Sequence, residues 1–366
     1  MRRPHSLLST AVAAVLALAA TTPGADAQTT ARPLPAVSLG SPAMSLSSAG
    51  FRPVSLSAGA ATPRAASAQP ASYNVPYPTD GALVAPSELV AGPAETLDLG
   101  SLEVFASARG EADLRSTSGS IEVQRGGLRA QIGQRKGAES AWAVSLANES
   151  SFYRFPSGAG LVPGEPKPFN DLYETRAGLQ LASRGTDRVT WIGGLELTMA
   201  GEDLVDPTDA LMVGGLGGVQ YRLNDEVDFS FGLAGESRLE DDAWIVPFFG
   251  FDWRPTEDLA FTVHGSELRA ALDLGESWSV HAGAVYDIRQ YRLNDGGPVD
   301  GGVFRDEEIR AALGATWQAS EAGRLSLEVG QVLWNELTVL DSGGGQVGQS
   351  EAEKAPYIGL SLTFGM

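Results

Sequence analysis

Cysteine is absent from the 366-residue chain, and this absence removes several chemistries at once. Without thiols the chain has no disulfide framework, no thiolate nucleophile and no attachment site for a lipid after an export signal. Histidine is nearly absent too, with only His5, His264 and His281. The last two lack a third neighbour at zinc-site spacing, and neither lies where barrel hydrolases place their catalytic pair. We therefore expect no enzyme activity, no metal and no other cofactor.

Long hydrophobic runs are also missing. Beyond residue 27 no stretch approaches the roughly 18 apolar residues that a membrane-spanning helix needs. Helical membrane proteins are thereby excluded, and a closed β-barrel is the other structure that satisfies its backbone hydrogen bonds in lipid. Residues 97–366 hold 21 of the 26 basic and 41 of the 45 acidic residues. A segment this acidic would repel phosphate, and we therefore expect no nucleic-acid partner.

The first 96 residues predict an export signal followed by a disordered lead. Arg2 and Arg3 precede a short apolar run at residues 10–20, and Ala25, Asp26 and Ala27 form a small-x-small cleavage site. The signal peptide is therefore expected at residues 1–27. Residues 28–96 are rich in Ala, Ser and Pro without apolar periodicity, which predicts a disordered periplasmic lead.

Residues 97–366 alternate apolar and polar side chains in segments separated by Gly, Asp, Asn, Pro and Ser. This pattern predicts an all-β fold, a transmembrane antiparallel up-and-down β-barrel of about 14 strands. Twelve strands remain an alternative, because residues 259–275 hold either two short strands or one bent one. Short turns are expected near residues 136, 185, 225, 256, 276 and 321, and longer connections at 154–171, 200–209, 292–306 and 335–355. Short periplasmic turns, long external loops and periplasmic termini follow from this alternation.

The two registers of the strands carry different side chains. Indoles prefer the boundary between headgroups and hydrocarbon, and five tryptophans near the short turns predict an aromatic girdle: Trp142, Trp191, Trp253, Trp278 and Trp317. The polar register is expected to line the lumen: Glu196, Arg222, Asp228, Glu236, Arg269, Asp273, His281, Asp287, Arg289, Arg310 and Glu328.

Two glycine runs have separate interpretations. Residues 214–218 (GGLGG) lie inside a predicted strand, where glycine permits bending or close approach of another backbone. Residues 343–345 (GGG) lie in the longest expected external loop and indicate a flexible linker.

Residues 97–366 resemble the uncharacterised outer-membrane β-barrel families, domains of unknown function, found in planctomycetes. The resemblance is carried by the signal, the Ala/Ser/Pro-rich lead, the hairpin spacing and the ending at residues 356–364 (PYIGLSLTF). It implies an outer-membrane location, contact with outer-membrane lipid and recognition of the ending by the barrel-assembly machinery. These families have no known active site, so the resemblance assigns no functional residue.

A barrel of about 14 strands lies between those filled by side chains and those that enclose an aqueous channel. We therefore expect a passive or weakly selective pore for small solutes or cations. The alternative is a non-conducting structural or surface-interaction barrel that acts through acidic external loops.

Overall fold

The computed structural model describes residues 96–365, except residues 137–138, 159, 204, 241–242 and 321–322. The expected signal peptide and all but the last residue of the expected lead lie outside the described residues. Within the described part of the chain, no helix is long and apolar enough to cross a membrane.

Fifteen strands make up the described structure. They are β1 (Thr96–Asp113), β2 (Ser120–Lys136), β3 (Ser140–Arg154), β4 (Leu172–Arg184), β5 (Val189–Glu202), β6 (Leu211–Arg222), β7 (Val227–Glu236), β8 (Trp244–Trp253), β9 (Leu259–His264), β10 (Glu267–Asp273), β11 (Trp278–Arg292), β12 (Val303–Ser320), β13 (Gly323–Leu340), β14 (Gln346–Ala352) and β15 (Ala355–Gly365).

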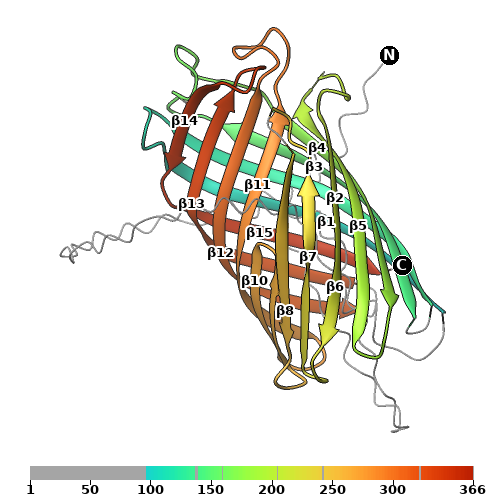
Figure 1. Cartoon of the computed structure of the whole chain (residues 1–366). Helices are drawn as coiled ribbons and strands as arrows, with labels where there is room; N and C mark the ends of the chain where they lie inside the picture. The colour runs from blue at the N-terminus through green and yellow to red at the C-terminus, as the bar shows by residue number, and fades with distance from the viewer. Residues whose placement is uncertain are drawn as a thin grey trace, which may run out of the picture. The chain divides into compact units, whose positions relative to one another are not determined.

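Fourteen of these strands form one closed antiparallel ring, which confirms the predicted barrel (Figure 1). Neighbours in the chain pair with each other from β1 to β13, and β15 closes the ring by pairing with both β13 and β1. Strand β14 lies outside the ring and pairs with the last residues of β13. We call the end of the barrel at which β13 ends, the top in Figure 1, the upper end. Residues 259–275 form two short strands, β9 and β10, as the 14-strand interpretation required.

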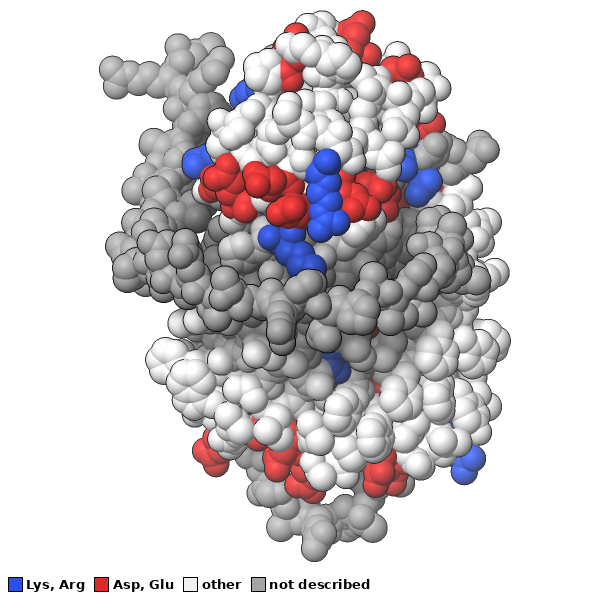
Figure 2. All heavy atoms as spheres, turned by 90° about the vertical axis from the view of Figure 1, so that its left-hand side faces the viewer, with Lys and Arg blue, Asp and Glu red and all other residues white. Residues whose placement is uncertain are grey.

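The apolar register of each strand faces outward. Leu195, Leu313 and Phe231 are more than half exposed, whereas residues of the other register, such as Glu196 and Ala312, are buried. Toward the upper end of the barrel the outward register becomes polar, so that Ile309 of β12 is followed by Glu307. On the face shown in Figure 2, acidic residues lie near the upper and lower ends, and more of them, with basic residues between them, form a band below the upper end.

Two expected loops are shorter than predicted. Strand β13 continues to Leu340 and turns directly into β14, so residues 335–355 are mainly a hairpin. The glycines at 343–345 form its turn and not a flexible linker: Asp341 Oδ1 accepts hydrogen bonds from the backbone N–H groups of Gly343 and Gly345 at 2.9 and 2.8 Å. Gly344 has a φ of 79°, a conformation that favours glycine. Strand β12 likewise begins at Val303, inside the expected connection at 292–306.

The ring is narrower at its upper end than at its lower end. Pairing between β10 and β11 stops at Glu267 and Val285. Beyond that point β11 leans inward, and Arg292 at its end pairs in parallel with Gly201 of β5. This contact brings nine strands together above β6–β10: β1–β5, β11–β13 and β15. Barrels of about eight strands are filled by their own side chains, so the upper end has the dimensions of a filled barrel.

Candidate functional site in the barrel interior

An apolar plug fills the upper end of the interior. Leu161, Val162 and Phe169 belong to the connection between β3 and β4, yet they are only 1%, 5% and 2% exposed. The Phe169 ring lies 5.5 Å from the ring of Tyr153 and 4.2 Å from that of Phe304. We use the name apolar plug for these three residues and the inward-facing strand residues around them: Ile121, Val123, Tyr153, Leu172, Tyr291, Phe304, Leu337 and Val339.

Close backbone contacts hold the plug connection in place. At Gly348 of β14 a Cβ atom would lie 1.6 Å from the carbonyl oxygen of Leu161, so only glycine allows this approach. Gly160 has a φ of 58°, and its α-carbon faces Ser118 in the β1–β2 turn. Ser120 N–H also donates to Gly158 O at 3.2 Å. The connection is thus fixed from two sides, and burial of each large apolar side chain stabilises it by about 1.5–3 kcal/mol.

A charged layer lies directly below the plug. On β2 and β12 it begins one inward position further down: Arg125 follows Val123 on β2, and Asp306 follows Phe304 on β12. The layer consists of eight buried residues: Arg109, Arg125, Glu149, Asp287, Arg289, Asp306, Glu308 and Arg310.

Asp306 joins opposite sides of the barrel. Its carboxylate accepts hydrogen bonds from Arg125 Nη2 of β2 at 2.7 Å and from the Tyr153 hydroxyl of β3 at 2.7 Å. Asn335 Nδ2 of β13 donates to its other oxygen at 2.5 Å. Strands β1, β15 and β13 separate β2 from β12 around the ring, so the Arg125–Asp306 pair crosses the interior.

Glu308 and Arg289 extend the layer. Glu308 contacts Arg310 at 2.8 Å, Arg125 at 3.4 Å and Arg109 at 3.5 Å. Arg289 of β11 pairs with Asp287 and also reaches Glu149 of β3, at 3.3 Å. Buried charges are tolerated only when they are paired, and removing one partner leaves an uncompensated charge. The layer therefore fixes the narrow cross-section that the β5–β11 contact creates.

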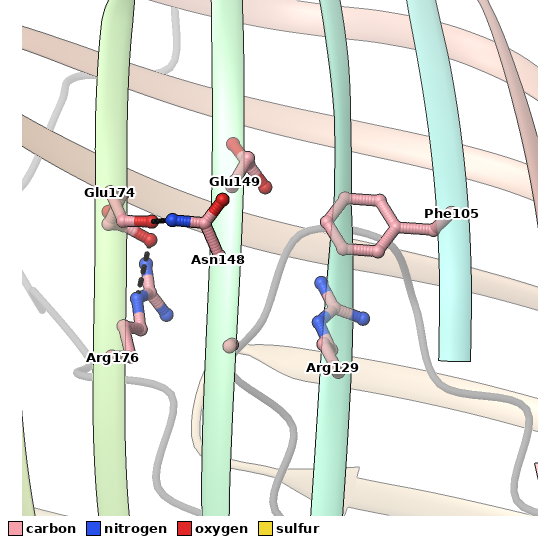
Figure 3. A pocket seen from close by; sticks show the side chains of 7 residues that line it. Phe105, Arg129, Asn148, Glu149, Glu174 and Arg176 are labelled. Atoms are coloured by element: carbon pink, nitrogen blue, oxygen red, sulfur yellow. Dashed lines mark hydrogen bonds and ion pairs between the residues drawn. The ribbon is translucent and has the colours of Figure 1, made fainter. Parts of the chain in front are cut away.

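Figure 3 shows a small cavity at the side of the charged layer. Arg176 and Glu174 face each other along β4, with Nε and Oε1 2.6 Å apart. The Arg129 guanidinium lies over the Phe105 ring, 4.2 Å from its centroid. The cavity measures about 10 Å³, room for a single water molecule. An organic solute is therefore excluded here.

The lower half of the interior includes an apolar strip on β6–β8. Phe248 belongs to the inward register of β8, and its ring lies against two glycines of the neighbouring strands. A Cβ atom at Gly218 or Gly232 would approach that ring to 2.8 or 2.7 Å. Glycine at these two positions therefore lets the phenyl ring lie flat on the wall. Leu216, Val246 and Trp244 continue the strip toward the upper end.

A break in strand pairing adjoins this strip. The β9–β10 hairpin ends at Gly265, whose N–H donates to Phe249 O of β8 at 3.4 Å. Above that level β8 pairs with β7 only, while β11 pairs with β12 only until Arg292 reaches β5. In Figure 1 the hairpin forms an arch well below the upper ends of its neighbours. We call this interruption between residues 244–249 and 286–290 the wall break.

The upper edge of the wall break is tied together by Arg292. Its guanidinium pairs with Glu240 and donates to the carbonyl oxygens of Gly301 at 2.8 Å, Leu239 at 3.1 Å and Asp209 at 3.0 Å. These partners belong to the β11–β12, β7–β8 and β5–β6 connections. One side chain thus holds three connections against the end of β11.

An acidic cavity of about 450 Å³ opens beside Arg292. Asp206, Asp209, Glu240 and Asp295 are among the residues that line it. Hydrogen bonds from the backbone N–H and the hydroxyl of Thr208 lower the pKa of Asp206. Asp206 is therefore ionised at neutral pH, and the cavity is negatively charged.

The structure places every residue of the predicted lumen set on the inward register. Seven are buried: Glu196, Arg269, His281, Asp287, Arg289, Arg310 and Glu328. Four are half-buried: Arg222, Asp228, Glu236 and Asp273. Three of the set meet in the charged layer, and four others form two separate pairs in the interior, Arg222–Asp228 at 3.6 Å and His281–Glu328 at 3.0 Å.

Sequence reasoning missed Arg109, Arg125, Glu149 and Asp306. Each lies above the main run of apolar residues in the outward register of its strand, so the alternation that marked the other inward residues had already faded. Extending the period of two upward from Glu103 through Phe105 and Ser107 reaches Arg109, so the signal was present. The plug residues had no such signal, because residues 156–168 contain Pro and Gly at seven positions.

The five girdle tryptophans lie at the lower ends of their strands with exposed rings. Trp278 and Trp317 stack with ring centroids 6.2 Å apart, and Trp253 stacks on Phe261 at 5.2 Å. Trp244 and Trp334 lie toward the opposite ends of β8 and β13.

Comparisons with known proteins give distant likenesses only. No protein-family model and no curated protein matches the chain. Among solved structures it is similar to an outer-membrane channel from Pseudomonas putida F1, 11% identical over 78% of this chain and all of the other, with a TM-score of 0.44. It is also similar to a Pseudomonas aeruginosa FadL homologue, 11% identical over 79% of this chain and 94% of the other, with a TM-score of 0.43.

The toluene transporter TodX from P. putida is 12% identical over 76% of this chain and 92% of its own, with a TM-score of 0.36. Likeness of this degree carries no argument about function. The resemblance to planctomycete families stays a prediction, and the 14-strand ring rests on the strand pairing itself.

Proposed function

We propose that the protein is an outer-membrane channel for small uncharged or amphipathic solutes, with the wall break as their access to the lower interior. The membrane location is supported by the outward apolar register, which ends near the five girdle tryptophans at its lower level and near Trp334 at its upper level. Such a band between aromatic girdles matches the hydrocarbon layer and its boundaries. The five girdle tryptophans take that role in this proposal.

One observation carries the choice of solute. The wall is interrupted where its inner face is apolar, whereas the charged part of the barrel interior is filled with side chains. On β8 the outward apolar register runs from Trp253 to Ile245, and the hairpin turn lies opposite Phe249, near its middle. The wall break therefore begins within the apolar band. A solute that partitions into the membrane meets Val246 and Phe248 there, without crossing the plug.

Ions meet a different barrier. A straight path along the barrel axis leads through the charged layer and the apolar plug, which are filled with side chains. An ion on this path loses its hydration shell without gaining free partners, because the carboxylates of the layer already face arginines. A weakly selective ionic pore would therefore need the plug to move.

The filled upper end also favours a second candidate, a structural barrel without transport. The test uses vesicles with lipopolysaccharide in the outer leaflet and measures uptake of a small uncharged aromatic solute. Val246→Trp should slow uptake by narrowing the inner side of the break, whereas Ile245→Trp, at the neighbouring outward position, should not. A structural barrel predicts no uptake above protein-free vesicles, and equal rates for both variants and wild type would reject the route.

A further inference from the structure

Three residues form a row across the inner wall at the lower edge of the wall break. Ser230 of β7 pairs directly with Gly250 of β8, and Gly250 pairs directly with His264 of β9. All three belong to the inward register. Because the middle residue has no side chain, those of Ser230 and His264 lean over it from either side.

Both side chains have an unused polar atom. Ser230 is 3% exposed and the His264 side chain 8% exposed, yet Ser230 Oγ and His264 Nδ1 have no hydrogen-bond partner among the described residues. A Cβ atom on Gly250 would lie 2.0 Å from Ser230 Oγ and 3.1 Å from His264 Nδ1. Both atoms therefore border the space above Gly250 that a side chain would otherwise fill.

The neighbouring carboxylate sets the chemistry of this point. Asp252 Oδ1 lies 2.9 Å from His264 Nε2, and an ionised carboxylate only accepts hydrogen bonds. This contact favours the tautomer in which Nε2 carries the proton, and in that tautomer Nδ1 is an acceptor. The Ser230 hydroxyl can donate. A ligand group that donates to Nδ1 and accepts from Ser230 satisfies both, and a hydroxyl does both with one oxygen.

The surroundings narrow the ligand further. Asp252 lies 2.9 Å from the His264 ring, and its negative charge disfavours an anion at this row. Phe248 precedes Gly250 by one inward position, about 7 Å along the strand toward the wall break. From this geometry we infer that Ser230, Gly250 and His264 form a binding niche for the hydroxyl of a small apolar alcohol or phenol, whose hydrocarbon part lies on Phe248.

The order Asp252, His264, Ser230 also resembles that of a hydrolytic triad. Hydrolysis would need backbone N–H donors for the developing oxyanion. At this row, β7, β8 and β9 pair on both sides of β8, and this pairing occupies its N–H groups. The row therefore has the features of a binding site and not those of a hydrolase.

This inference rests on the proposed function for the ligand's access, but binding is measurable apart from transport. Phenol and toluene differ by the hydroxyl, so both are titrated into refolded full-length protein in detergent, with histidine ¹⁵N resonances as the readout. We expect phenol to shift the His264 Nδ1 resonance and to bind more tightly than toluene. Ser230→Ala should lower the phenol preference about fivefold, the effect of one lost hydrogen bond.

Gly250→Ala fills the niche and should abolish the phenol-dependent shift. Gly217→Ala is the matched control, because a Cβ atom at this outward position of β6 has nothing within 4 Å. Equal affinity for phenol and toluene, or a phenol preference unchanged in both Ser230→Ala and Gly250→Ala, would overturn the niche. Solute uptake without a hydroxyl preference rejects the niche alone, whereas hydroxyl-selective binding without uptake rejects the transport proposal alone.

Discussion

The upper and lower parts of this barrel are built from the same strands but have different interiors. The upper part is filled with side chains, and the lower part is wider. Nine strands meet at the top around a plug and a layer of crossed ion pairs, whereas below them 14 strands enclose a wider interior with an apolar strip. The change follows from one strand, because β11 leaves β10 after Val285 and ends against β5. Strand number alone therefore does not determine whether a barrel is open. The strand ends decide it as well.

The largest expected effect breaks the upper part. Arg125→Ala removes the guanidinium that faces both Asp306 and Glu308 and leaves buried carboxylates short of a partner. We expect the free energy of unfolding to fall by about 3–5 kcal/mol, measured by urea unfolding in detergent. The matched change in the lower half, Arg222→Ala, breaks a less buried pair, whose side chains are 11% and 21% exposed, and should cost less than Arg125→Ala. Equal losses would mean that the charged layer does not brace the upper ring.

A somewhat smaller effect is expected when the plug is loosened. Phe169→Ala removes a buried ring, for which about 3 kcal/mol is the low end of the range, and the connection can relax into the space. Ion conductance in a planar bilayer should rise as the plug detaches. Phe231→Ala, an outward and exposed phenylalanine, serves as the control and should leave conductance unchanged. A silent Phe169→Ala variant would show that the charged layer alone closes the path.

The Arg292 contact should give a moderate effect. Arg292→Ala removes the donors that hold the β5–β6, β7–β8 and β11–β12 connections, a loss of about 1–3 kcal/mol for hydrogen bonds to a charged group. Hydrogen exchange of residues 205–210 should become faster, while that of the lower turns stays the same. Arg292→Lys keeps the charge but lacks the planar set of guanidinium N–H donors. It should therefore keep only part of the protection against hydrogen exchange. Unchanged exchange rates would show that Arg292 does not hold these connections against β11.

The smallest effect is expected at the lower turns. Asp187 pairs with Arg184 at 2.5 Å, but its side chain is 95% exposed. Exposed pairs of this kind contribute about 0–1 kcal/mol, so Asp187→Ala should leave the thermal midpoint of unfolding nearly unchanged. A loss as large as that of Arg125→Ala would remove the contrast between the two parts of the barrel.

Much of the fold was predictable from the sequence, because alternation has a physical cause. Lipid on one side and a polar interior on the other force a period of two, which located the 14 strands, including the short β9 and β10. The same period placed Arg289 and Arg310 inside. Pairing partners are another matter, since alternation continues unchanged through residues 286–292 while β11 exchanges β10 for β5. The upper ring was therefore beyond prediction.

The candidate site divides in the same way. Arg289 and Arg310 followed from the register. Arg289 reaches Glu149, and Arg310 shares Glu308 with Arg125, contacts that depend on which strands meet and how far each side chain reaches. Leu161 and Val162 lie among Pro and Gly residues, where an external loop was the natural interpretation. Their burial depends on Gly348, nearly 190 positions later, whose missing side chain admits the loop. Such long-range fits leave no local pattern.

The central claim is that uncharged solutes enter the lower interior through the wall break, whereas the filled upper part blocks ions. One paired measurement tests it most directly. Refolded wild-type protein from a single preparation is placed in planar bilayers for conductance and in lipopolysaccharide-containing vesicles for uptake of a small uncharged aromatic solute. The account predicts uptake above protein-free vesicles together with no sustained ion conductance. Steady ohmic conductance of the wild type would contradict it, because an open axial path would then exist despite the plug.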